Sequence, residues 1–256
     1  MTAVYHPFNG VFWALCAGFA MVLVLASLLL RRRSERTRRA VIVTACALTT
    51  VGFFVYKYFL SIDAEFDAAT AAMGGFNWWG ELPLQLCNIN MLLIPIAVLT
   101  RKRPLLSFCF FVGPLGAAMA ICMPGTGFSD CSILLPRMLG YYGTHFMIII
   151  EALSLVTFGL FRPKFRDLPG TAATILLVAL AVHGVNALLR ISGLHEHANY
   201  FFSMETEGNF LLEIFRSWVP YPFLYLLPSI VILAVYMAVI MGIFALADRK
   251  KTAARV

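Results

Sequence analysis

The chain has 256 residues, of which 61% are hydrophobic and 13% charged, and its formal net charge is +7. So large a hydrophobic share excludes an ordinary soluble domain. The Lys and Arg residues form short clusters beside hydrophobic segments, as membrane flanks and contacts with lipid headgroups do, so we expect no nucleic-acid partner.

The hydrophobic segments are long enough to cross a membrane as α-helices, which takes about 20 residues each. We predict one integral membrane domain over residues 1–256, an all-α polytopic bundle of seven transmembrane helices. The predicted helices span residues 11–30, 40–60, 82–99, 104–123, 138–160, 170–190 and 220–246. The first segment has no basic residue before it and is long enough to span, which argues against a cleavable signal peptide.

Charge alternates between the loops that join these segments. Lys and Arg follow the first, third, fifth and seventh segments, at residues 31–39, 101–103, 162–166 and 249–255. Acidic residues collect in the other loops. The positive-inside rule therefore predicts an N-terminus outside and a C-terminus in the cytoplasm, and an even number of helices would break the alternation. We expect a multi-pass protein of a bacterial cytoplasmic membrane.

The loops on the outer side are the longer ones. A short interfacial helix is expected at about residues 207–216. Cys122 and Cys131 flank the outer loop after the fourth segment and are a candidate disulfide, because the exterior is oxidising. The spacing of the six cysteines is not that of a metal site, and we expect neither a metal nor another cofactor.

Polar side chains within the predicted helices lie at one depth near the outer face. With a helix rise of 1.5 Å per residue, this depth is about 5–10 Å from the helix ends. Polar groups inside a membrane are costly and mark function by default, although a structural belt of hydrogen bonds between helices is the alternative. The layer and its edge contain Lys57, Glu81, Gln85, Cys87, Asn88, Tyr141, His145, His183, Asn186 and Arg190.

Cys87 and His145 are the candidate catalytic pair of this layer. A thiol becomes a strong nucleophile when an imidazole can take its proton. Asn88, Gln85 or Asn186 could orient the imidazole or donate to an oxyanion, and the remaining polar residues are candidates for substrate binding. A site about 10 Å deep matches the acyl ester level of a phospholipid, so the expected partners are phospholipids or lysophospholipids.

Two functions remain open from these residues. The first is acyl transfer to, or hydrolysis of, a membrane lipid in the outer leaflet. The second is a carrier or receptor-like protein without catalysis, which binds a small molecule or a lipid in the same polar layer. The oligomeric state is not predictable from the sequence.

Several short motifs resemble those of the YwaF-like integral membrane family and, more distantly, the vertebrate transmembrane protein 164 family. They are residues 82–88 (LPLQLCN), the helix of His145, residues 185–186 (VN), 199–202 (NYFF) and 220–222 (PYP). The resemblance implies a membrane-embedded lipid enzyme, because the vertebrate relative is regarded as a Cys-dependent acyltransferase that makes ether phospholipids. A wider clan, the androgen-induced-type lipid hydrolases, uses Thr and His inside the membrane. The chain departs from the family at Gln85, where His is usual, and the vertebrate Cys aligns nearer Leu84 than Cys87.

Overall fold

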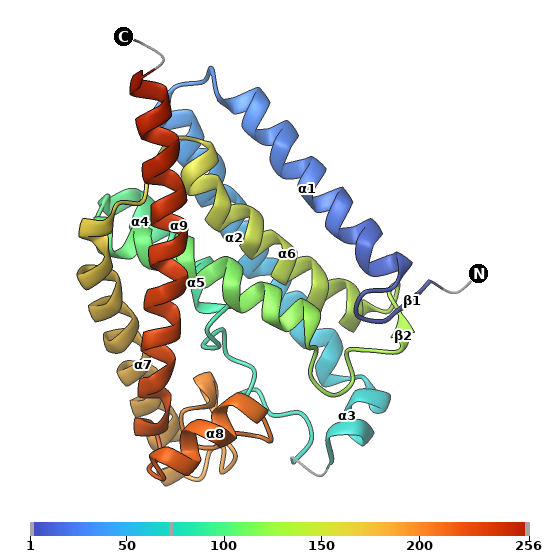
Figure 1. The fold of residues 1–256 in the computed structure, drawn as a ribbon. Coiled ribbons are helices and arrows are strands. Elements are labelled where there is room, and N and C mark those ends of the chain that lie inside the picture. Colours follow the sequence, from blue (N-terminus) through green and yellow to red (C-terminus); the bar gives the residue numbers. More distant parts are fainter. Residues whose placement is uncertain (1–2, 72–73, 254–256) are drawn as a thin grey trace.

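A computed structural model describes residues 3–71 and 74–253 of the chain, most of which are helical (Figure 1). The elements in chain order are β1 (Val4–Tyr5), α1 (Gly10–Leu30), α2 (Glu35–Ser61), α3 (Ala64–Thr70), α4 (Ile89–Thr100), α5 (Arg103–Cys122), β2 (Cys131–Ser132), α6 (Pro136–Thr157), η2 (Phe165–Asp167), α7 (Leu168–Ile191), η3 (Tyr200–Phe202), α8 (Phe210–Trp218), η4 (Leu224–Leu226) and α9 (Leu227–Ala253).

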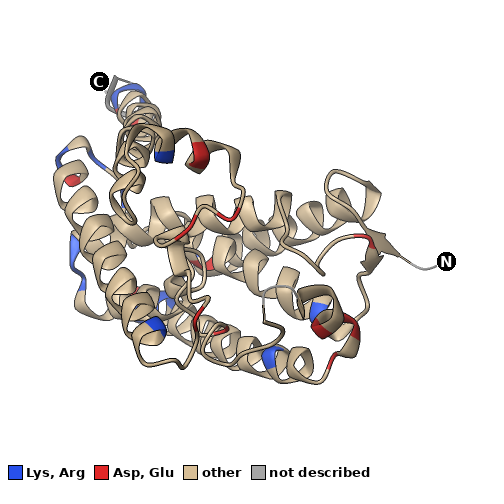
Figure 2. Cartoon of the chain, turned by 90° about the horizontal axis from the view of Figure 1, so that it is seen from below, with Lys and Arg blue, Asp and Glu red and all other residues tan. Residues whose placement is uncertain are grey.

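Six helices of the described chain are long and apolar enough to cross a membrane, namely α1, α2, α5, α6, α7 and α9. The prediction of an all-α polytopic membrane bundle is thereby confirmed. Figure 2 shows the apolar character of these helices, because long stretches of them contain no Lys, Arg, Asp or Glu. The short helix expected at about residues 207–216 is present as α8, which begins at Phe210.

The third predicted span differs from the prediction. Helix α4 has 12 residues and covers about 18 Å, little more than half of a bilayer core. Residues 82–88, which we expected to begin the helix, form turns instead. Pro83 has no backbone N–H, and the N–H of Leu82 donates to the hydroxyl of Tyr200 at 2.9 Å. The polar groups of this segment are thus partly bonded to a distant loop and not to a helix of their own.

A central group of helices, α2, α4, α5 and α6, forms the core of the bundle. Helix α1 packs on α6, α7 packs on α5, and α9 packs on α7. A Cβ atom at Gly140 would lie 2.1 Å from the Cβ of Tyr56, so α2 and α6 cross where no side chain fits. Large apolar side chains of the outer helices are exposed, such as Leu29 on α1 and Val231 on α9. They give the molecule the apolar exterior that lipid contact requires.

The four basic segments meet at one end of the bundle. Nη2 of Arg101 lies 4.0 Å from the carboxylate of Glu35, which joins the first two segments. Arg103 donates to the carbonyl of Arg162 at 3.0 Å, and Arg162 pairs with Asp248 through Nε and Oδ2 at 2.9 Å. The charge alternation of the sequence therefore corresponds to a shared end of the structure.

The opposite end is held by Arg137, whose side chain is buried. Arg137 donates to Asp63 at 2.6 Å and to Glu65 at 2.9 Å. Burial opposes the charged form of Asp63, but the hydrogen bonds from Arg137 and from the backbone N–H of Phe66 outweigh it and hold the pKa of Asp63 below its usual value. This ion-pair cluster ties α3 to the beginning of α6.

The expected disulfide between Cys122 and Cys131 is not formed, since both are free thiols in the structure. Strand β1 lies between the two ends of their loop. The backbone of Tyr5 pairs with Cys131, and its hydroxyl donates to the carbonyl of Ile121 at 2.8 Å. The fully buried Tyr5 therefore closes this loop without a covalent bond.

Candidate functional site

Cys87 lies at the end of the turn segment, directly before α4 begins at Ile89. Its side chain is buried, and the backbone N–H groups of Asn88 and of Cys87 itself face the sulfur. Asn88 is the N-cap residue of α4, but its side chain makes no capping hydrogen bond. The N-terminus of a helix carries partial positive charge, which offsets in part the cost that burial imposes on a thiolate or an oxyanion at this position.

A glycine on α5 permits this placement of Cys87. A Cβ atom at Gly116 would lie 3.3 Å from the backbone nitrogen of Cys87 and 3.5 Å from its Cα. Helix α5 thus presents bare backbone to the segment before α4. The close approach brings Cys87 toward α6, which packs on both α4 and α5.

His145 on α6 lies against Cys87. Its Nε2 is 3.4 Å from the Cys87 sulfur, and its Nδ1 is 2.7 Å from the backbone carbonyl of Tyr141. A carbonyl oxygen only accepts hydrogen bonds, so Nδ1 carries the proton and Nε2 presents its lone pair to the thiol. Tyr141 is fixed in turn by a hydrogen bond from its hydroxyl to the carbonyl of Ala120 at 3.0 Å and by stacking on Phe128.

Lys57 on α2 adds a charge to this region. Its side chain is buried, forms an ion pair with Glu81, and lies 4.7 Å from the ring centre of Tyr56. The ammonium group is within electrostatic range of both Cys87 and His145. The structure therefore brings Lys57 and Glu81 from different parts of the chain to the edge of the Cys87–His145 contact.

The polar residues of α7 have a different position. Asn186 donates to the carbonyl of Tyr200 at 2.8 Å and to the hydroxyl of Ser203 at 2.9 Å, and it accepts from the N–H of Tyr200 at 3.0 Å. Nδ1 of His183 is 3.0 Å from the same hydroxyl of Ser203. Arg190 donates to the carbonyl of Ala198 at 2.8 Å. These three residues of α7 fix the segment 198–205.

Gln85 connects the two groups. Gln85 precedes Cys87 by two residues in the chain. Its side-chain oxygen accepts a hydrogen bond from the backbone N–H of Phe201 at 3.1 Å. The described hydrogen bonds of His183, Asn186 and Arg190 do not reach Cys87 or His145. These three residues bond instead to the segment 198–205, which also contacts Gln85.

Residues that the sequence reasoning did not select also build the site. Tyr200 bonds to Leu82, Trp79 and Asn186, and Ser203 bonds to two residues of α7. The NYFF motif was a signal for Tyr200, whereas nothing in the sequence distinguishes Gly116 from other helical glycines. Among the described residues, no group of three or more His, Cys, Asp or Glu side chains could hold a metal ion.

The comparison with known families agrees with one of the two resemblances predicted above. The family model of the TMEM164 family matches residues 4–241, and the chain belongs to this family. The similarity to the vertebrate transmembrane protein 164 family is thus confirmed, whereas the similarity to the YwaF-like family stays a prediction. No curated protein and no solved structure shows significant similarity to the chain.

Proposed function

We propose that this member of the TMEM164 family is a membrane-embedded enzyme that transfers or hydrolyses an acyl group of a lipid. Cys87 is the nucleophile and His145 the general base. The observation that carries the proposal is the 3.4 Å approach of the Cys87 sulfur to Nε2, while Nδ1 is bonded to the carbonyl of Tyr141. This is the arrangement in which an imidazole activates a thiol.

The first half of the reaction forms an acyl-enzyme. Nε2 of His145 takes the thiol proton, and the sulfur of Cys87 attacks the carbonyl carbon of a lipid ester. The tetrahedral intermediate carries a negative oxygen, which the N–H groups before α4 and the ammonium of Lys57 can stabilise. The C–O bond then breaks, and the leaving alkoxide takes the proton from His145, so that a thioester on Cys87 and a lipid alcohol result.

The second half regenerates the thiol. His145 removes a proton from an acceptor hydroxyl, and the acceptor oxygen attacks the thioester carbonyl. The C–S bond breaks and the sulfur recovers the proton from His145. A lysolipid hydroxyl as acceptor gives acyl transfer, and water gives hydrolysis, so the same residues serve either outcome.

A lipid substrate is supported by the surroundings of Cys87. The turn segment 82–88 interrupts a membrane-spanning stretch, and irregular backbone at membrane depth is tolerated where it lines a site or is buried in protein. The side-chain oxygen of Asn88 is buried without a hydrogen-bond partner. A buried unpartnered acceptor favours a ligand that donates, such as the hydroxyl of a lysolipid.

The test uses purified full-length protein in lipid nanodiscs with a phospholipid labelled on its acyl chain. Wild-type protein is expected to carry the label on Cys87 and to release or transfer it. Cys87→Ala should abolish both labelling and turnover, and His145→Ala should lower turnover about 100- to 10,000-fold, the range of a general base.

The matched control is Cys109→Ala, which removes a thiol that is also buried but lies on α5 in a hydrophobic core cluster. This variant should label and turn over as the wild type does. Turnover that persists in Cys87→Ala would exclude Cys87 as nucleophile. Lipid binding by the wild type without turnover would instead favour the carrier or receptor-like alternative.

A further inference from the structure

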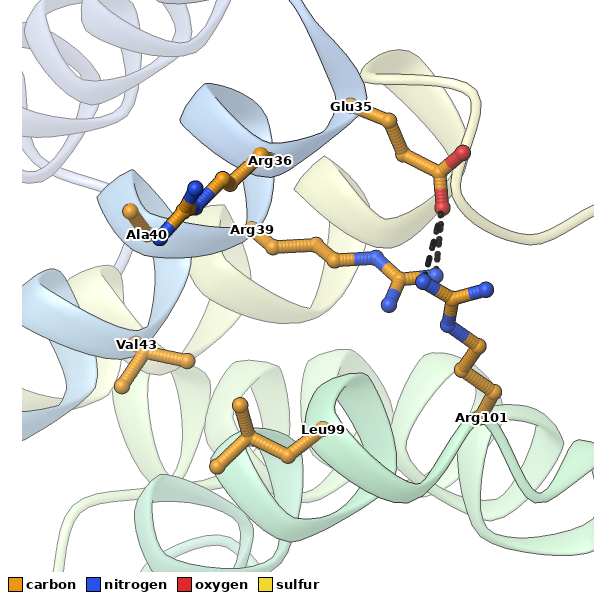
Figure 3. Close-up of a pocket in the computed structure, with 7 residues that line it drawn as sticks. All are labelled: Glu35, Arg36, Arg39, Ala40, Val43, Leu99 and Arg101. Carbon is orange, nitrogen blue, oxygen red and sulfur yellow. Dashed lines mark ion pairs between the residues drawn. The ribbon is translucent and has the colours of Figure 1, made fainter.

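A cavity of about 430 Å³ opens at the basic end of the bundle, between the beginning of α2 and the end of α4 (Figure 3). Helix α4 separates it from Cys87, which is about 18 Å away along the helix axis. The Cys87–His145 contact is at the other end of α4, so the two sites share no lining residue. The cavity is lined by Glu35, Arg36, Arg39, Ala40, Val43, Leu99 and Arg101.

Two guanidinium groups converge on one anion in this cavity. Figure 3 shows Arg39, from α2, and Arg101, which follows α4, reaching the carboxylate of Glu35 from different elements. The contact between Arg101 and that carboxylate is long, at 4.0 Å. The side chain of Arg101 is 68% exposed and that of Glu35 is 53% exposed, so solvent or a ligand can replace this contact. The internal carboxylate shows where an anionic group fits between the two arginines.

The arginines also keep unused donors. Nε of Arg39 is buried and has no hydrogen-bond partner, although the guanidinium group bears a charge. Arg36 lines the same cavity and forms no ion pair among the described residues. Three arginines and one carboxylate line the cavity, so it has net positive charge and free N–H groups that match the oxygens of a phosphate.

The rest of the lining is apolar. Ala40 and Val43 lie on α2 one and two turns beyond Arg36, and Leu99 is the last apolar residue of α4. Leu99 is 66% exposed toward the region between these helices. The cavity therefore combines a cationic mouth with an apolar wall that runs into the membrane-spanning part, which suits an amphiphile better than a free anion.

We propose that this cavity binds the phosphate headgroup of an anionic phospholipid, with an acyl chain along Ala40, Val43 and Leu99. Phosphate oxygens take the place of the Glu35 carboxylate between Arg39 and Arg101. The bound lipid bridges α2 and α4, the two helices that bring Lys57 and Cys87 to the candidate site. The proposal does not depend on the proposed chemistry of Cys87.

The experiment measures lipid retention by the purified full-length chain in neutral detergent, with native mass spectrometry. The probes are phosphatidylglycerol, phosphatidylcholine of the same acyl chains, and inorganic phosphate. Wild-type protein should retain phosphatidylglycerol at least about tenfold better than phosphatidylcholine, because one basic residue near an anionic headgroup contributes about a fivefold preference. Millimolar inorganic phosphate should not displace the lipid.

Three variants separate the parts of the site. The double variant Arg36→Gln/Arg101→Gln should lose about tenfold in phosphatidylglycerol binding, and Glu35→Gln should gain severalfold because the competing carboxylate is absent. Ala40→Trp fills the apolar wall at an exposed position and should weaken lipid binding. The matched control is Arg31→Gln/Arg33→Gln, which removes two charges from the same end but none from the cavity and should change binding less than about twofold.

Equal loss in the two double variants would overturn the proposal, because it would show a diffuse effect of charge and not a site. Displacement by inorganic phosphate, with Ala40→Trp unaffected, would overturn the lipid assignment in favour of a simple anion site. A decrease of binding in Glu35→Gln would contradict the proposed exchange of carboxylate for phosphate.

Discussion

A backbone carbonyl, and not an acidic side chain, sets the orientation of the His145 ring. The carbonyl of Tyr141 accepts from Nδ1 at 2.7 Å, one helical turn before His145. Many nucleophile–His sites use a carboxylate for this purpose, but a carboxylate at this depth would add a charge that must be stabilised inside the membrane. A carbonyl has a second lone pair and fixes the tautomer without that cost.

Gly116 offers a test of this geometry that leaves every functional group in place. Gly116→Ala puts a Cβ atom 3.3 Å from the backbone nitrogen of Cys87, so the segment must shift by a few tenths of an ångström. We expect turnover of the labelled lipid to fall about tenfold, because small misplacements of reacting groups are costly. The measurement is the turnover rate together with the melting temperature in detergent.

The control for Gly116→Ala is Gly143→Ala on α6. A Cβ atom at Gly143 meets nothing within 4 Å, although the residue is only two positions from His145. This variant should keep the wild-type rate. Unchanged turnover in Gly116→Ala would show that the position of Cys87 tolerates displacement, which would weaken the role assigned to the Cys87–His145 contact.

At the level of elements, hydropathy predicted all the long helices but not the break before α4. Residues 82–88 are apolar enough to extend a span, and only their contacts with the distant residues Tyr200 and Phe201 show why they form turns. The depth of Cys87 was calculated with a helical rise that does not apply to this segment. The contact between Cys87 and His145 nevertheless forms, because α4 packs against α5 and α6. The role of α7 could not be predicted, since it depends on a loop whose path only the fold defines.

The segment 198–205 gives the prediction at this scale. Asn186→Leu removes both of its hydrogen bonds to the backbone of the buried Tyr200. The N–H of Tyr200 is then unpaired, at about 1–3 kcal/mol, and its carbonyl keeps only the bond from the N–H of Ser203 at 3.3 Å. We expect amide exchange in the segment to become at least about tenfold faster, and exchange at residues 85–88 to rise through Gln85. Hydrogen exchange with mass spectrometry measures both regions.

Thr174→Val is the matched variant on the same helix. Among the described residues its hydroxyl bonds only to the carbonyl of Gly170 within α7, so exchange in the segment 198–205 should remain at the wild-type rate. Faster exchange at 198–205 with no change at 85–88 would show that Gln85 does not transmit the loosening. The residues of α7 would then have no influence on the position of Cys87.

At the scale of the whole molecule, the contacts decide whether the short helix α4 belongs to a crossing. Glu81 is paired with Lys57 at the acidic end, and Arg101 lies near Glu35 at the basic end. The chain between residues 81 and 101 therefore passes from one end of the bundle to the other, although only part of it is helical. The turns and α4 together take the place of the third predicted span, and a seventh crossing with alternating loops stays a prediction.

The predicted orientation has the N-terminus outside and the C-terminus in the cytoplasm. The basic segments share one end of the bundle, and such an end is retained on the cytoplasmic side during insertion. In a bacterial host, green fluorescent protein fused after the C-terminus should fluoresce, and alkaline phosphatase fused there should be inactive. Phosphatase inserted after Gly193, in the loop between α7 and α8, should be active. An active phosphatase at the C-terminus would contradict the orientation, whereas fluorescence at the C-terminus with an inactive insertion at Gly193 would contradict the crossing by α9.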